Sequence, residues 1–163
     1  MDPRYLLDTN ICIYIRREKP ERVLRHFDKL SPGEAAISVI TYGELLYRAT
    51  KSSRREASLE IVREFVRLVL PLPMPEKAAE VYGFIRANLE VRGEMIGAND
   101  LWIAAHAMAA GLTLVTNNEK EFRRVRGLKV QNWASQQFRA LATDPARDAL
   151  PPQTDWPPSH RPR

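Results

Sequence analysis

The chain has 163 residues, of which 44% are hydrophobic and 28% are charged. This is enough apolar material to build the core of one folded domain, and it argues against a chain that is disordered throughout. No apolar run approaches the ~18 residues that a bilayer span needs, so we expect no membrane association. A net charge of +5, from 25 basic and 20 acidic residues, is compatible with a polyanionic partner but does not prove one.

Cysteine use and the amino-terminal residues bear on the compartment. The single cysteine, Cys12, excludes an internal disulfide framework and a zinc site built on cysteines. Residues 1–4 include an acid and are not followed by the long apolar run of a secretory signal. We therefore expect a cytoplasmic protein.

Short apolar segments alternate along the chain with segments of helical periodicity. In chain order we predict a strand at Tyr5–Leu7, a helix from Ile11 to about Arg17, a strand at Ala35–Val39, helices from Thr41 and over Leu59–Val69, an edge strand at Val69–Leu72, helices at Ala78–Leu89 and Leu101–Ala110, and strands at Leu112–Val115 and Lys129–Gln131. Gly111 should end the last of these helices. Short strands separated by helices predict an α/β fold with three layers, a central parallel sheet covered by helices on both faces.

The carboxy-terminal part has a different composition. Six of the twelve prolines follow Thr143, and proline can neither continue a helix nor join a central strand. We predict one folded domain over residues 1–138 and a proline-rich, flexible tail over residues 139–163, extended from Thr143 onward.

Acidic side chains follow several of the predicted strands. These are Asp8 after the first strand, Glu44 one turn into the helix after the second, Asp100 at the start of the alanine-rich helix, and Asn118, Glu119 and Glu121 after the strand Leu112–Val115. In an open α/β sheet, ligands bind outside the carboxyl ends of the strands, so these groups can meet at one edge.

Each acid also has an ordinary structural explanation. Asp8 could cap a helix or form an Asx turn, Thr41 and Glu44 fit a capping box, and Asp100 or its neighbour Asn99 could be a helix N-cap. Glu121 could pair with Arg123, Arg124 or another basic neighbour on the surface. Taken together these explanations weaken, because converging carboxylates repel one another unless a divalent cation such as Mg²⁺ or Mn²⁺ neutralises them.

Four sequence blocks resemble those of a known family. They are Leu7-Asp8-Thr9-Asn10, Ile37 to Leu45 (ISVITYGEL), Asn99 to Ala107 (NDLWIAAHA) and Leu114 to Phe122 (LVTNNEKEF). In this order, over roughly residues 4–135, they resemble a PIN domain, and most closely the VapC-type toxins of bacterial toxin–antitoxin modules.

The resemblance implies a magnesium-dependent endoribonuclease in which Asp8, Glu44 and Asp100 bind the metal. Many PIN domains carry an Asp at the place of Asn118, so we assign Glu121 as the fourth catalytic and metal-binding acid. Asn118 then becomes a neutral oxygen ligand or water holder near the substrate. Mg²⁺ is the expected cofactor, with Mn²⁺ as the alternative.

The resemblance also implies partners: an RNA substrate such as a tRNA loop, a cognate antitoxin, and a second copy of the chain in a homodimer or hetero-oligomer. Among the basic residues we single out Arg86, on the helix before Asp100, for contact with RNA phosphate; the alternative is a solvated charged face. Apolar surface near Ile11–Ile15 and Leu45–Tyr47 could receive the antitoxin, or could all be core.

Two rival functions remain at this point. A haloacid-dehalogenase-type phosphatase needs Asp-x-Asp after its first strand, but Asn10 stands at the second position. A non-catalytic PIN-like module that only binds RNA or acts as a scaffold would lack one of the acids, whereas Asp8, Glu44 and Asp100 are all present. Among the three histidines, His106 lies in an apolar run and is expected to be packed rather than to act as a base.

Overall fold

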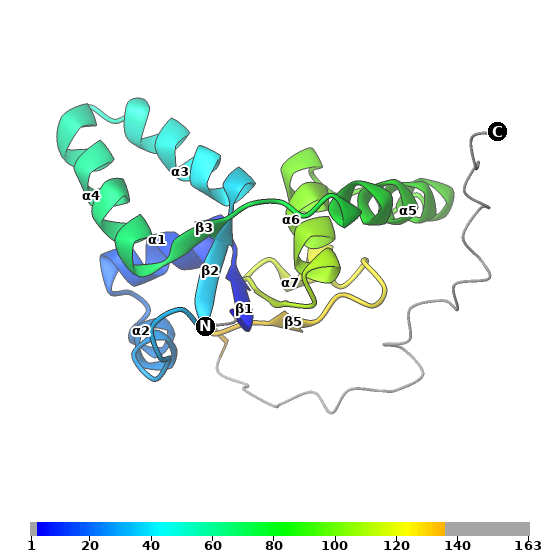
Figure 1. Ribbon diagram of the computed structural model, residues 1–163, viewed down its shortest axis with the longest axis horizontal. Coiled ribbons are helices and arrows are strands. Elements are labelled where there is room, and N and C mark those ends of the chain that lie inside the picture. Colours follow the sequence, from blue (N-terminus) through cyan, green and yellow to red (C-terminus); the bar gives the residue numbers. More distant parts are fainter. Residues whose placement is uncertain (1–2, 136–163) are drawn as a thin grey trace.

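The structure is a computed structural model that describes residues 3–135 (Figure 1). In chain order its elements are β1 (Tyr5–Leu7), α1 (Thr9–Arg17), α2 (Glu21–Phe27), β2 (Ala35–Ser38), α3 (Val39–Thr50), α4 (Arg55–Leu68), β3 (Leu70–Leu72), α5 (Lys77–Arg92), α6 (Ala98–Ala109), β4 (Thr113–Val115), α7 (Glu119–Phe122) and β5 (Val130–Gln131). The predicted domain boundary at 138 and the proline-rich tail lie outside the described residues.

The five strands form one parallel sheet in the order β3-β2-β1-β4-β5. β1 is central, and its residue Leu7 lies in register with Ile37 of β2 and Val115 of β4. β3 is an edge strand, as predicted. An edge strand tolerates Pro71 because it forms ladder hydrogen bonds on one side only. The order of the strands changes direction next to β1, and this is where an α/β sheet opens a crevice for a ligand.

Alternation along the strands divides the interior into two cores. Leu6 and Leu114 point to one face and pack with buried residues of α5, α6 and α7, whereas Leu7, Ile37 and Val115 point to the other face and pack with α1, α2, α3 and α4. Figure 1 shows the two sets of helices on opposite sides of the sheet. The predicted α/β/α architecture is therefore confirmed.

The structure corrects several predicted boundaries. α3 begins at Val39, directly after the strand, because the hydroxyl of Ser38 accepts a hydrogen bond from the amide of Ile40 and caps the helix (3.2 Å). Val39 therefore belongs to the helix and not to the strand. The helices α2 and α7 were not predicted. They have seven and four residues and each buries a single residue, so no apolar period develops in the sequence.

The alanine-rich helix α6 is almost wholly buried along its middle. It begins at Ala98, earlier than predicted, and ends as expected before Gly111, whose φ of +70° continues the chain in the left-handed region. His106 is 1% exposed, and its Nδ1 lies 3.1 Å from the hydroxyl oxygen of Ser38. This confirms that His106 is a packed residue. Among the described residues, no helix is long and apolar enough to cross a membrane.

Candidate active site

Asp8 lies at the carboxyl end of the central strand and is 5% exposed. Its Oδ1 accepts a hydrogen bond from the amide of Thr9 (2.7 Å), and its Oδ2 accepts one from the hydroxyl of Thr116 (2.8 Å). Burial raises the pKa of Asp8, while these two hydrogen bonds and the charge of Arg48 oppose the rise and the charge of Glu44 adds to it. Asp8 is therefore the N-cap of α1, and it also presents a buried carboxylate at the sheet edge.

Thr116 is a site residue that the sequence analysis missed. Because Leu7 pairs with Val115, the residues that follow these two strands, Asp8 and Thr116, emerge at the same level of the sheet. The Thr116 hydroxyl donates to Asp8 and accepts from the amide of Asn118 (3.0 Å). Its position directly after a predicted strand, in line with Asp8, was the signal that could have identified it.

Glu44 is held between two other elements of the site. Its Oε1 accepts from the side-chain amide of Asn99 in α6 (2.9 Å), and its Oε2 accepts from the hydroxyl of Thr9 in α1. The capping-box alternative is wrong, because Ser38 caps α3 and Thr41 is buried inside the first turn. Glu44 is thus free of a capping role and joins α3 to α1 and α6.

Asp100 has a raised pKa that reflects both its burial and the acidic side chains around it. It is the third residue of α6, whose N-cap is Gly97, so the N-cap alternatives at Asn99 and Asp100 are wrong. Its pKa is raised from 3.8 to about 7, first by burial and then by the negative charges of Asp8, Glu121 and Glu44. Four acids from four elements therefore occupy one electrostatic neighbourhood at the carboxyl edge of the sheet.

Glu121 reaches this neighbourhood from α7. A side-chain hydrogen bond with Glu121 contributes to the raised pKa of Asp100. The surface-pairing alternative finds no support, because Arg123 pairs with Glu119 (2.6 Å) and Arg124 donates to the carbonyl of Met95 (2.9 Å).

The basic side chains near the acids differ in the interactions that they already make within the protein. Arg86, the predicted phosphate contact, is bonded to Glu90 (Nε to Oε1, 2.9 Å) and to the hydroxyl of Tyr82 (3.2 Å) on the exposed side of α5. Arg48 is the cation whose charge reaches Asp8. Arg92 is partly used in the fold, since it donates to the carbonyl of Arg124 (2.6 Å).

The donor chemistry of the acidic cluster fits a hard divalent cation. The four acids offer only oxygen atoms, and their mutual repulsion, seen in the pKa of Asp100, is relieved by positive charge. Within residues 3–135, no three acidic, histidine or cysteine side chains already form a metal-ligand cluster, and Asp8 and Glu44 instead accept hydrogen bonds from hydroxyl and amide groups. The metal-ligand assignment therefore stays a prediction.

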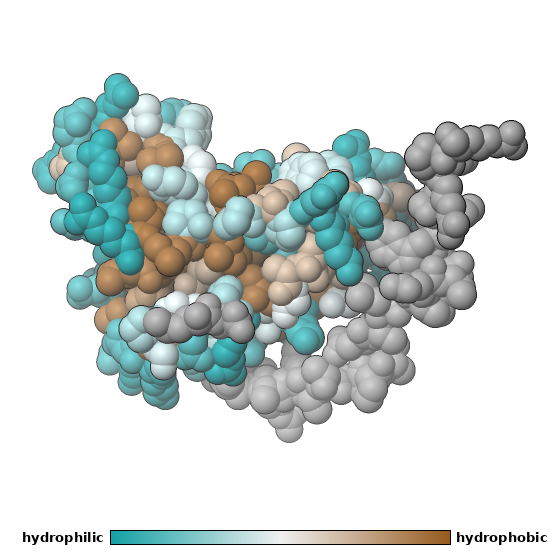
Figure 2. Space-filling view, in the orientation of Figure 1, coloured by the Kyte–Doolittle hydropathy of each residue, from teal (hydrophilic) through white to brown (hydrophobic). Residues whose placement is uncertain are grey.

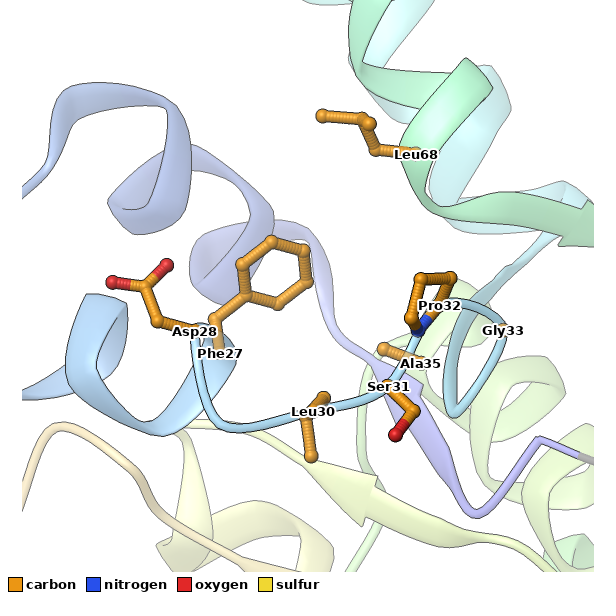
Figure 3. Close-up of a pocket in the computed structure, with 8 residues that line it drawn as sticks. All are labelled: Phe27, Asp28, Leu30, Ser31, Pro32, Gly33, Ala35 and Leu68. Atoms are coloured by element: carbon orange, nitrogen blue, oxygen red, sulfur yellow. The ribbon is translucent and has the colours of Figure 1, made fainter.

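A separate hollow lies at the other end of the sheet (Figure 3). A cavity of about 200 Å³ is bordered by Phe27 at the end of α2, Leu68 at the end of α4, and Pro32 and Ala35 around the start of β2. Because β2 begins there, this is the amino-terminal edge of the strands, away from the acids. Asp28 is the only acidic side chain among its lining residues, so the cavity is not the catalytic centre.

Comparison with known proteins identifies the family of the chain. Residues 5–128 match the PIN domain family. Ribonuclease VapC2 of Haemophilus influenzae is 41% identical over 130 residues, which cover 80% of this chain and 98% of that protein. The chain belongs to the VapC-type ribonucleases of the PIN-domain family.

Other VapC proteins resemble the chain to a similar degree. The tRNA(fMet)-specific endonuclease VapC of Shigella flexneri is 41% identical over 131 residues, covering 80% of this chain and 98% of that protein. The crystal structure of DNA-bound VapBC from Salmonella typhimurium superposes with a TM-score of 0.75 at 39% identity, over 80% of this chain and 98% of the compared one.

Proposed function

We propose that this VapC-type endoribonuclease is the toxin of a toxin–antitoxin pair, and that it hydrolyses RNA phosphodiester bonds in the cytoplasm with a divalent cation held by Asp8, Glu44, Asp100 and Glu121. The single observation that supports this most is the convergence of Asp8, Glu44 and Glu121 on Asp100, whose pKa is raised first by burial and then by these three carboxylates. Folding does not require carboxylates to be brought together against their repulsion, whereas a cation-binding site does.

The chemistry follows from what the residues can hold in place. Bound Mg²⁺ or Mn²⁺ would lower the pKa of a water molecule and stabilise charge on a phosphate oxygen. Thr116 and the Thr9 amide fix the orientation of the Asp8 carboxylate, and Asn99 fixes that of Glu44. These supporting bonds hold the acids on rigid elements, as a site that must position a phosphate requires.

Protonation of Asp100 makes the proposed site pH-dependent. With a pKa of about 7, Asp100 holds a proton in about half of the molecules at neutral pH. Cation binding requires the ionised carboxylate and must release this proton. We therefore expect activity to rise between about pH 6 and pH 8.

RNA must approach this acidic cluster over basic groups, because the carboxylates alone would repel phosphate. Arg48 and Arg86 are exposed, and we propose that both contact the RNA backbone, with Asn118 beside the scissile phosphate. The relative from Shigella flexneri is named a tRNA(fMet)-specific endonuclease, and a tRNA loop, whose bases are unpaired, is the substrate that we propose.

The test compares acids inside and outside the cluster. With purified protein, Mg²⁺ and a tRNA pool, Asp8→Asn and Glu121→Gln should each lower the cleavage rate by at least about 100-fold. Glu119→Gln is the matched control on the same helix as Glu121, because Glu119 bonds Arg123 and Asn132 and should retain near wild-type rates. Equal activity of Asp8→Asn and wild type would support the scaffold alternative and refute the enzyme mechanism.

The products provide a second test. Hydrolysis by an activated water leaves a 5′-phosphate and a 3′-hydroxyl, and sequencing of RNA ends after induced expression reports both the ends and the cleaved position. Ends that carry a 2′,3′-cyclic phosphate would contradict the mechanism.

We propose that the antitoxin binds the hairpin formed by α3 and α4, residues 39–68, which we call the α3–α4 arm. Ile11, Cys12 and Ile15 are buried in the core, and Ile13 and Tyr14 are half-buried, so α1 offers little free apolar surface. Exposed apolar side chains instead lie on the arm and at the adjoining sheet edge: Tyr47 (62% exposed), Ile61, Leu68 and Leu70. Figure 2 shows apolar surface along this arm and across the neighbouring part of the molecule.

The toxin role is tested in cells. Induced expression should arrest growth, co-expression of the antitoxin should relieve the arrest, and Tyr47→Ser with Leu68→Ser should weaken the relief without lowering RNA cleavage. Homodimerisation is a further proposal, checked by analytical ultracentrifugation of the toxin alone.

A further inference from the structure

A pair of aromatic rings joins α5 to α6 and has no role in the acidic cluster. Tyr82 of α5 and Trp102 of α6 are stacked, with ring centroids 4.0 Å apart and ring planes inclined by 15°. Tyr82 packs on the core formed with α5 and α6, whereas Trp102 belongs to neither core of the described residues. Both side chains are half-buried, so each retains accessible surface.

Helix geometry relates Trp102 to Asn99, a residue that touches the acidic cluster. It follows Asn99 by three residues on α6, so both lie on one side of the helix about 5 Å apart along its axis. Asn99 donates to Glu44, one of the four acids. Residues 103–107 in the following turns are buried, so Trp102 is the large aromatic side chain that α6 leaves partly exposed one turn from Asn99.

A cation completes the arrangement. Arg86 donates to the hydroxyl of Tyr82 (3.2 Å), and its guanidinium remains half exposed although it also pairs with Glu90. Stacked rings with an adjacent guanidinium match a nucleotide, whose base has an apolar face and whose phosphate carries negative charge.

We propose that Trp102, backed by Tyr82, is a stacking platform for an unpaired nucleobase next to the scissile phosphate, with Arg86 contacting that nucleotide's phosphate. The platform rests on the proposed ribonuclease function and adds to it a residue that selects single-stranded RNA. Duplex RNA keeps its bases stacked on one another and cannot use the platform without unpairing.

The first experiment removes the nucleobase from the substrate and the Trp102 ring from the protein, separately and together. Cleavage is measured on a single-stranded oligoribonucleotide and on a series of the same oligomer with one abasic nucleotide at each position near the cut. Trp102→Leu should raise KM roughly 5- to 100-fold with little change in kcat. One abasic position should raise the KM of wild type by a similar factor and leave that of Trp102→Leu nearly unchanged, since the stack is already lost.

Two companion variants separate binding from folding. Trp102→Phe keeps a smaller ring and should restore most of the lost affinity, while Val91→Ala, at an 89% exposed position of α5, should behave as wild type. If Trp102→Leu lowers the melting temperature but leaves KM unchanged, the rings only pack α5 against α6 and the platform is refuted.

Fluorescence gives a readout that does not depend on cleavage. In EDTA, saturating single-stranded oligoribonucleotide should quench part of the tryptophan emission of wild type, and this quenching should be absent in Trp102→Phe, which retains the other two tryptophans. Equal quenching in both proteins overturns the proposal. A failure of the ribonuclease function itself is distinguishable, because it would appear as Asp8→Asn cleaving like wild type.

Discussion

Replacement of Asp100 by asparagine should stabilise the protein at neutral pH in the absence of metal. The carboxylate has a pKa of about 7 in the folded chain because of burial and the charges of Asp8, Glu121 and Glu44, against 3.8 for the ordinary side chain. Folding therefore places a negative charge where other carboxylates disfavour it. The asparagine would keep the shape of the side chain, and its amide could still donate to Glu121.

The magnitude follows from the two pKa values. The difference between 3.8 and about 7, at about 1.36 kcal/mol per pH unit, gives an upper bound of about 4 kcal/mol. Asp100 is only half-buried, so screening by water reduces the effect, and we expect about 1–2 kcal/mol. For a chain of this length that is a rise of roughly 3–6 °C in melting temperature.

The direction in which folding stability changes with pH distinguishes the raised pKa of Asp100 from other causes of stabilisation. Below about pH 4 Asp100 is protonated in both the folded and the unfolded chain, so Asp100→Asn and wild type should be equally stable. As pH rises from about 4 to 7 the unfolded chain loses this proton first, so wild type loses the stability that the raised pKa supplied. Above pH 7 the advantage of Asp100→Asn should be constant.

Urea unfolding at pH 4, 6 and 8 in EDTA measures this difference. Glu64→Gln removes an exposed carboxylate in the middle of α4 and should show no comparable pH-dependent gain. Added Mg²⁺ should raise the stability of wild type more than that of Asp100→Asn, because only the ionised cluster binds it tightly. An Asp100→Asn protein no more stable than wild type at pH 8, or equally stabilised at every pH, would refute the repulsion argument.

Two further predictions concern buried polar side chains. Thr116→Val should cost about 1.5–3 kcal/mol and raise the pKa of Asp8 further, because it removes the hydroxyl that donates to the carboxylate; Thr116→Ser should largely avoid both effects in urea titrations and pH–rate profiles. Burial lowers the pKa of His106, so wild type should lose stability as pH falls below about 6.5, where the unfolded chain gains the proton. His106→Leu should show a shallower loss between pH 7 and pH 5 in thermal unfolding, and an identical slope would contradict that assignment.

The sequence by itself determined the layered fold and the edge at which the acids lie. Short apolar strands separated by helices require a parallel sheet with two covered faces, and Asp8 directly after a strand could only emerge at its carboxyl end. Proline beside a short apolar run was enough to place β3 at an edge. The short helices α2 and α7 escaped prediction because one buried residue each leaves no period to detect.

Only the tertiary structure decided which of the ordinary capping and pairing explanations hold for the acids. Whether Glu44 caps its helix depends on where α3 begins, and the hydroxyl of Ser38 settles that by capping it at Val39. Glu119 and Glu121 both follow the fourth strand and only the family resemblance separates them in the sequence, whereas in the structure Glu119 pairs with Arg123 and Glu121 bonds Asp100. The pairing of Trp102 with Tyr82 likewise depends on how α5 and α6 pack, since contacts between distant segments arise from packing and not from local pattern.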